Sequence, residues 1–135
     1  MNAILAPCII ACAHAASLAE PTAYATELAS LVNAYRAAKN AAPLAAEDTL
    51  STIAREHSAA MARAHKLSHD DFQSRFRRSA YSMCVENVGW NYATAPQQLE
   101  AWQQSPGHDR NLLDARVTHA GVGVAGDYVT LIACR

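Results

Sequence analysis

The chain has 135 residues, enough for one domain with a single buried core, and 51% of its residues are apolar. Its formal net charge at pH 7 is -1, so its overall charge does not attract it to nucleic acid or to an anionic membrane surface. We therefore expect a single-domain monomer that does not bind nucleic acid.

The first residues of the chain predict a signal for export. Residues 4–13 are apolar but too few to span a bilayer, and residues 13–15 form a small-x-small pattern that is typical of a cleavage site. We predict a signal peptide over residues 1–19, cleaved after Ala15 or Ala19, and a folded domain over residues 20–135. The protein would then be secreted, that is, periplasmic or extracellular.

Two other interpretations of this segment stay open. Residues 9–12 resemble a bacterial lipoprotein processing site, which would leave the protein anchored through a lipid on Cys12. In the second, residues 4–18 form the first helix of the mature fold.

Apolar residues recur at helical spacing in the next part of the chain. They predict an amphipathic helix over residues 23–38 and another over residues 50–64, separated by a linker at residues 41–43. The apolar stripe of the second helix consists of Leu50, Ile53, Ala54, His57, Met61 and Ala64.

A short basic helix or turn is predicted over residues 70–79. We expect Phe72 and Phe76, four residues apart, to face inward, and Arg75, Arg77 and Arg78 to face solvent. Basic side chains beside two phenylalanines also suggest a contact with anionic lipid.

The second half of the chain predicts mostly strands. We expect a strand over residues 85–92, a helix over residues 96–104, and a turn with a short helix over residues 105–113. Residues 117–125 and 128–134 predict an antiparallel hairpin. Helices followed by antiparallel strands are typical of a layered α+β domain.

The cysteines favour a disulfide between Cys84 and Cys134. These two remain when Cys8 and Cys12 are removed with the leader, and an even pair is typical of an exported protein. Both lie in predicted strands, and the bond would be worth about 4 kcal/mol in the chain-entropy description. The alternative is a pair of buried thiols.

Polar residues capable of chemistry are concentrated between residues 84 and 113. Glu86 and Asn87 interrupt an apolar, β-prone run, where burial of an unpaired carboxylate is costly, so we expect a donor or a cation beside Glu86. His108 follows Pro106-Gly107, a turn signal that can present an imidazole at the mouth of a cleft.

Other candidates point less clearly to chemistry. His65 and His69 have the spacing of zinc-binding helices, but no Glu follows the first His, and we do not expect the two rings to share one helix face. His57 lies on an apolar stripe, where we expect a hydrogen-bonded structural histidine. A Ser-His-acid triad can be assembled around Ser68 or Ser105, but no nucleophile elbow or oxyanion-hole signal accompanies it.

His69, Glu86 and His108 remain, and they come from three separate predicted elements. Two imidazoles and a carboxylate are typical of a site for Zn²⁺ or another divalent cation with open positions. The same groups also suit a hydrogen-bonded acid and base cluster without any cofactor.

Several motifs occur in an order that resembles one known family. They are Asn33-x-x-Arg36, Pro43-Leu44, Leu50-x-x-x-Ala54-x-x-His57-Ser58-x-x-Met61, Leu67-Ser68-His69, Glu86-Asn87-Val88, Trp102-x-x-Ser105-Pro106-Gly107-His108 and Gly121-Val122-Gly123-Val124. Over roughly residues 28–135 the chain resembles the CAP superfamily of cysteine-rich secretory proteins, antigen 5 and pathogenesis-related class 1 proteins, in its compact bacterial SCP-like branch. The resemblance implies an α-β-α sandwich, in which a central antiparallel sheet lies between helices, with a cleft on one side.

The cleft of that family carries two His and two Glu. The resemblance places His69 and His108 at the two His positions and Glu86 at the first Glu position, while Ser105 lies near the position of the second Glu. It also implies that Asn87 and Ser105 lie in the cleft. The longer eukaryotic loop associated with sterol binding is missing.

We therefore expect a secreted binding module rather than an enzyme, with a cleft for a divalent cation or a small or lipid ligand at His69, Glu86 and His108. The missing fourth residue favours binding, and we assign no catalytic residue. The alternative is a metal-dependent, protease-like hydrolase with Glu86 as base to a metal-bound water. A third interpretation is that the histidines only hydrogen-bond Glu86 and support the walls of the cleft.

Overall fold

The computed structural model of the chain describes residues 21–135, with side chains from residue 23. The elements in this part are α1 (Pro21–Ala38), β1 (Ala45–Ala46), α2 (Asp48–Ala64), α3 (Phe72–Ser79), β2 (Cys84–Trp90), α4 (Ala95–Gln103), α5 (Pro106–Leu112), β3 (His119–Ala125) and β4 (Tyr128–Cys134). All the helices and strands predicted from residue 23 onward are present, with small shifts of their ends. The sequence did not predict β1, because two residues are too few to show a strand period.

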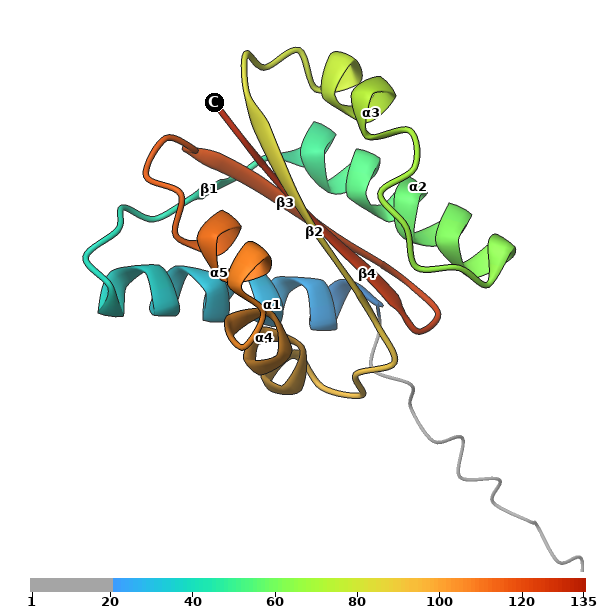
Figure 1. The fold of residues 1–135 in the computed structure, drawn as a ribbon, viewed down its shortest axis with the longest axis horizontal. Helices are drawn as coiled ribbons and strands as arrows, with labels where there is room; N and C mark the ends of the chain where they lie inside the picture. Colours follow the sequence, from blue (N-terminus) through green and yellow to red (C-terminus); the bar gives the residue numbers. More distant parts are fainter. Residues whose placement is uncertain (1–20) are drawn as a thin grey trace, which may run out of the picture.

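The strands form one sheet in the order β1-β3-β4-β2 (Figure 1). β4 pairs antiparallel with both β2 and β3, and every residue of β4 is buried. The predicted hairpin is therefore confirmed, and it turns at Gly126, whose φ of 55° suits glycine. β1 adds a short parallel pair at the outer edge of β3.

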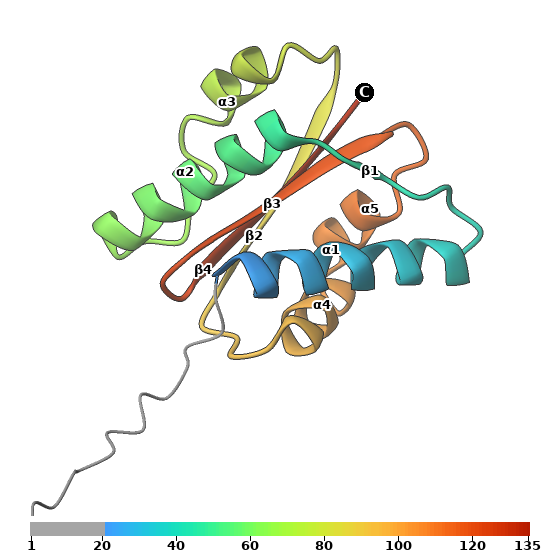
Figure 2. The same cartoon turned by 180° about the vertical axis from the view of Figure 1, so that it is seen from behind.

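Helices cover both faces of this sheet. α2 packs along β3 and β4 on one face with α3 beside it, whereas α1, α4 and α5 cover the other face (Figure 1), as the view from behind also shows (Figure 2). The α+β class and the α-β-α sandwich are thus confirmed, with a sheet that is antiparallel except for β1.

A separate hydrophobic core lies on each face. The core beneath α1 and α4 contains Leu28, Val32, Leu99 and Trp102, and the core beneath α2 contains Leu50, Ile53, Ala54 and Ile132. Glu47 caps the start of α2, because its side chain accepts hydrogen bonds from the backbone N–H groups of Thr49 and Leu50.

α2 lies very close to β3. A Cβ atom on Gly121 would lie 2.1 Å from the backbone nitrogen of Ser51, and one on Gly123 would lie 2.0 Å from that of Arg55. Only glycine leaves room for the helix backbone at these two positions, which explains the paired glycines of this strand.

The predicted disulfide is confirmed. Cys84 and Cys134 are directly opposite each other in the β2–β4 pair and are bonded through their sulfur atoms. The bond holds the start of β2 against the end of β4, and so it fixes the position of Glu86 two residues further along β2.

Within residues 21–135, no helix is both long enough and apolar enough to cross a membrane. The predicted signal peptide over residues 1–19, its cleavage after Ala15 or Ala19, and the alternative anchor at Cys12 lie outside the described residues.

Candidate functional site

Glu86 is a buried carboxylate on β2, and its side chain is only 2% exposed. Arg75 of α3 binds it at two points: Nε donates to Oε2 over 2.7 Å and Nη2 donates to Oε1 over 2.7 Å. This is the two-point geometry in which a guanidinium binds a carboxylate most firmly. The cation that the buried position of Glu86 requires is therefore Arg75.

The position of Arg75 corrects one expectation. We expected Arg75, Arg77 and Arg78 to face solvent together, but Arg75 is buried, at 6% exposure, while the other two are exposed. Arg75 also donates through Nη1 to the carbonyl of Asp70. Because Arg75 is turned inward, the surface suggested for contact with anionic lipid loses one of its three arginines.

Two histidines lie beside the same carboxylate. His69, in the loop between α2 and α3, has its Nδ1 atom 2.9 Å from Glu86 Oε1, and its side chain is 53% exposed. His57 of α2 is buried, donates from Nε2 to the carbonyl of Ser68 over 2.7 Å, and lies 3.9 Å from Glu86 Oε1. The expected structural role of His57 is confirmed by this hydrogen bond.

His108 lies on the opposite face of β2. Its carbonyl accepts a hydrogen bond of 3.1 Å from Nδ2 of Asn87, the residue after Glu86. Since successive side chains of a strand point to opposite faces, Glu86 faces α3 and Asn87 faces α5. His69 and the backbone of His108 therefore lie on the two opposite faces of the same strand.

Side chains also close this outer edge of β2. Asn111 donates to the carbonyl of Glu86 over 3.1 Å, and Nε1 of Trp102 donates to the carbonyl of Val88 over 2.9 Å. The amide of Asn111 also donates to Oδ1 of Asn87 over 2.9 Å. The strand that carries the candidate site is thus held from both faces and along its edge.

The environment keeps two of the histidines neutral near pH 7. Burial lowers the pKa of His57, and the positive charges of Arg75 and His69 lower it further, against the opposing effects of Ser68 and Glu86. Burial also lowers the pKa of His108, and the charge of His69 adds to that shift.

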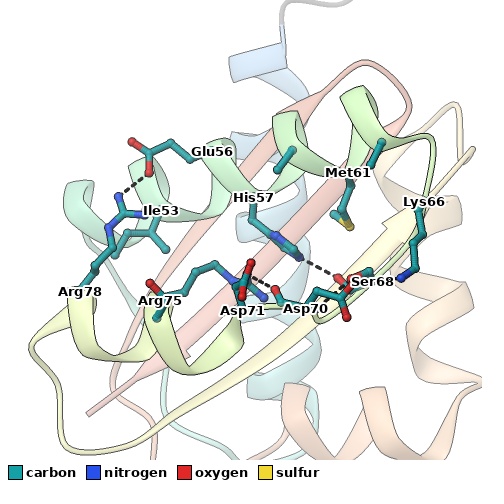
Figure 3. Close-up of a pocket in the computed structure, with 13 residues that line it drawn as sticks. Ile53, Glu56, His57, Met61, Lys66, Ser68, Asp70, Asp71, Arg75 and Arg78 are labelled. Atoms are coloured by element: carbon teal, nitrogen blue, oxygen red, sulfur yellow. Dashed lines mark hydrogen bonds and ion pairs between the residues drawn. The ribbon is translucent and has the colours of Figure 1, made fainter.

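A cavity of about 350 Å³ lies between α2 and α3, next to the buried ion pair. Figure 3 shows His57 and Arg75 pointing into it from the two helices, with Arg78 bound to Glu56 at one end and Lys66 beside Asp70 at the other. Oppositely charged side chains pair along its rim, so the cavity has no strong net charge.

The remaining candidates from the sequence do not assemble into a catalytic group. His65 is the C-cap of α2 with a left-handed backbone, so it does not share a helix face with His69. The hydroxyl of Ser68 accepts the N–H of Asp70. Ser105 precedes α5 as its N-cap residue, in the short connection between α4 and the helix of His108.

The three predicted ligands, His69, Glu86 and His108, suit a metal ion only in part. Among the described residues, no group of three or more His, Cys, Asp or Glu side chains is arranged to hold a metal ion. Glu86 already has a cation on both oxygen atoms, and so it does not fit as a direct ligand. His69 and His108 would be the two protein ligands, with Glu86 orienting the ring of His69 from behind.

Sequence reasoning missed three residues of this site. Arg75 was assigned to the surface, His57 was not placed beside Glu86, and Asn111 was not singled out. The one signal that pointed to Arg75 was the need of a buried carboxylate for a cation, since α3 provides the basic residues nearest in sequence to Glu86.

Comparison with known proteins places the chain among CAP domains. Residues 29–132 match the CAP family, described as the cysteine-rich secretory protein family. The uncharacterized protein YkwD of Bacillus subtilis (strain 168) is 32% identical over 110 residues, which cover 76% of this chain and 42% of YkwD.

Solved structures show the same fold. An extracellular protein containing an SCP domain from Bacillus anthracis superimposes with a TM-score of 0.81 at 26% identity, over 85% of this chain and 41% of that protein. An outer surface protein of Borrelia burgdorferi superimposes with a TM-score of 0.74 at 17% identity, over 82% of this chain and 90% of that protein. The chain thus spans about two fifths of YkwD and of the B. anthracis protein.

Proposed function

The chain belongs to the CAP family of cysteine-rich secretory proteins, and from this we propose that it is a non-enzymatic binding domain of the extracellular type. We propose further that His69 and His108 bind a divalent cation at the outer edge of β2. Glu86 supports this site by orienting His69 and does not contact the ion.

The observation that carries this proposal is the ion pair of Arg75 with Glu86. A general base must be free to accept a proton from water, but both oxygen atoms of Glu86 already accept hydrogen bonds from a buried guanidinium. The pairing counts against the hydrolase that the sequence left open, and it supports a role for Glu86 in positioning.

The two imidazoles support cation binding in different ways. The contact of His69 Nδ1 with Glu86 leaves Nε2 as the nitrogen available to a ligand, on a side chain that is half exposed. The lowered pKa of His108 keeps its ring neutral, which a metal ligand requires. With two protein ligands, the remaining coordination positions fall to water or to a bound molecule.

Calorimetric titration of the chelator-treated protein with zinc chloride tests the proposal. We expect saturable binding with one ion per chain at about pH 7.5, and weaker binding at about pH 5.5, because protons compete for the imidazoles. His69→Ala and His108→Ala should each weaken binding by about tenfold or more, since each removes one of two ligands.

The matched control is His65→Asn, which removes an exposed histidine near His69 while keeping a residue that tolerates its left-handed backbone. We expect this variant to bind zinc as the unchanged protein does. If the His69→Ala/His108→Ala double variant keeps the affinity of the unchanged protein, the proposed site is wrong.

A further inference from the structure

We propose that the outer edge of β3 binds an extended peptide segment. The peptide would form a strand parallel to β3 beside Val122 and Val124, with small apolar side chains toward α1 and an acidic side chain beside Arg55. This peptide site is separate from the histidine pair and lies at the opposite edge of the sheet.

Backbone hydrogen bonding along β3 is incomplete at this edge. Ala45 N–H donates to the carbonyl of Thr118, and Glu47 N–H donates to the carbonyl of Ala120, so β1 pairs with the first part of β3 only. Strand alternation directs the N–H and C=O groups of Val122 and Val124 to the same side. Among residues 21–135, no strand pairs with that part of β3.

At the other edge of the sheet, which β2 forms, side chains cover outward carbonyls of the strand. Along β2, side chains of Asn111 and Trp102 cover the outward carbonyls of Glu86 and Val88. An exposed row of backbone donors and acceptors is a ready template for another strand, and proteins usually cover such rows. The open part of β3 is therefore the place in this sheet where a partner strand can add.

A cavity of about 350 Å³ follows this open edge. Its floor includes Val122 and Val124, and its walls include Ala25 and Ala29 of α1 and Ser51 and Arg55 of α2. Figure 2 shows β3 between these two helices, seen from behind. Ala25, Ala29 and Ser51 are small, which leaves room for a peptide backbone beside the strand at the usual spacing of about 4.8 Å.

The two walls determine which peptide fits. Side chains of an added strand alternate, so one row would meet Ala25 and Ala29 and the other would meet Ser51 and Arg55. The first row should be small and apolar. Arg55 is exposed and takes part in no ion pair within the described residues, so an acidic side chain in the second row complements its charge.

The direction of the peptide follows from β1. This strand runs parallel to β3 and ends at Ala46, where the chain turns away into α2 and the cavity begins. A peptide that continues the line of β1 would start near Asp48 and reach Arg55 two turns further along α2. Its acidic residue therefore belongs near its C-terminal end, away from Asp48.

The test uses a fluorescent heptapeptide, Val-Thr-Val-Thr-Val-Glu-Val, blocked at both ends, in anisotropy titrations with the full chain. We expect saturable binding. Methylation of the peptide nitrogens that face β3 should weaken it about tenfold, because backbone hydrogen bonds supply most of the affinity in strand addition. If the methylated and unmethylated peptides bind equally well, binding depends on apolar contacts and not on backbone hydrogen bonds to β3, and the proposal is overturned.

Two variants of the protein locate the binding. Val124→Pro removes an outward N–H without removing a hydrogen bond to β4, and it should weaken binding about tenfold. Arg55→Glu, on the exposed face of α2, should weaken it about fivefold and improve binding of the matching peptide with Lys in place of Glu by a similar factor. This charge exchange does not depend on the stability of the proline variant.

Other occupants give different results. A second copy of this chain as the true occupant of the edge would appear as a dimer in sedimentation that an excess of the peptide does not dissociate. Dimer formation of this kind, absence of peptide binding, or binding unaffected by both Val124→Pro and Arg55→Glu would each overturn the proposal.

Discussion

Arg75 and Glu86 form a buried, two-point ion pair between α3 and β2, with both hydrogen bonds at 2.7 Å. Few other contacts join α3 to the rest of the domain, since it packs mainly against α2. The pair therefore fixes the short helix on the sheet, and it determines the environment of His57 and His69 at the same time.

Removal of Arg75 should be strongly destabilising. Arg75→Met leaves the carboxylate of Glu86 buried without its cation, and we expect the free energy of unfolding to fall by about 3–5 kcal/mol in urea titrations. The double variant Arg75→Met/Glu86→Leu should recover at least half of that loss, because it buries no unpaired charge.

The control for this prediction is Arg78→Met on the same helix. Arg78 pairs with Glu56 at the surface, where both side chains are about half exposed, so its loss should cost less than about 1 kcal/mol. Equal losses for Arg75→Met and Arg78→Met would contradict the importance assigned to the buried pair.

The disulfide should contribute a large share of the stability. Cys84 and Cys134 are 50 residues apart, and the chain-entropy relation gives about 4 kcal/mol for a loop of that length. In a chain with Cys8→Ser and Cys12→Ser, thiol titration under denaturing conditions should find no free thiol. Replacing Cys84 and Cys134 by Ala should lower the free energy of unfolding by about that amount, and two titratable thiols before replacement would refute the bond.

Stability should decrease as the pH falls below the ordinary histidine range. Because burial lowers the pKa of His57 in the folded protein, the unfolded chain binds a proton first as the pH drops below about 6.5. The contribution of His57 to the free energy of unfolding is complete above about pH 6.5 and decreases as the pH falls toward the lowered pKa of His57. The urea midpoint measured with a chelator should therefore be lower at about pH 5.5 than at about pH 7.5.

His57→Gln should reduce this dependence on pH, since an amide does not titrate and can still donate to the carbonyl of Ser68. His65→Asn should leave the dependence unchanged. If the midpoint of the unchanged protein is the same at both pH values, the buried neutral state of His57 is wrong.

The close approach of α2 to β3 makes Gly123 difficult to replace. A Cβ at this position would lie 2.0 Å from the backbone nitrogen of Arg55, so Gly123→Ala must displace the helix. We expect a loss of about 3 kcal/mol or more in the free energy of unfolding.

Gly107→Ala is the matched control, because the nearest atom to its Cβ is the end of the Arg110 side chain at 3.8 Å. Gly107 lies in α5, where alanine is the better helix former, and the substitution should be neutral or stabilising by up to about 1 kcal/mol. Similar losses at Gly107 and Gly123 would contradict the packing described for α2.

Local patterns in the sequence were sufficient for most of the fold. The apolar spacing from Leu50 to Met61 predicted α2, and the two apolar runs around Gly126 predicted the hairpin. The pairing of Cys84 with Cys134 followed from their number and their strands. The helices and strands depend on periods of a few residues, and the disulfide on a count of cysteines, and a sequence displays both directly.

The arrangement around Glu86 was beyond such patterns. Its buried position predicted a partner cation. The spacing of Phe72 and Phe76 on the short helix α3, however, predicted that Arg75 faces solvent, whereas it is buried. The gain from pairing a buried carboxylate outweighed that local preference and turned Arg75 inward.

By itself, the sequence determined the helices, the hairpin, the disulfide and the need of Glu86 for a cation, because each follows from local periodicity or from the chemistry of one side chain. The tertiary structure decided that Arg75 supplies the cation, that His69 and His108 lie on opposite faces of β2, and that β1 leaves part of the β3 edge open. These relationships join residues far apart in the chain, and only the packing of helices on the sheet brings them together.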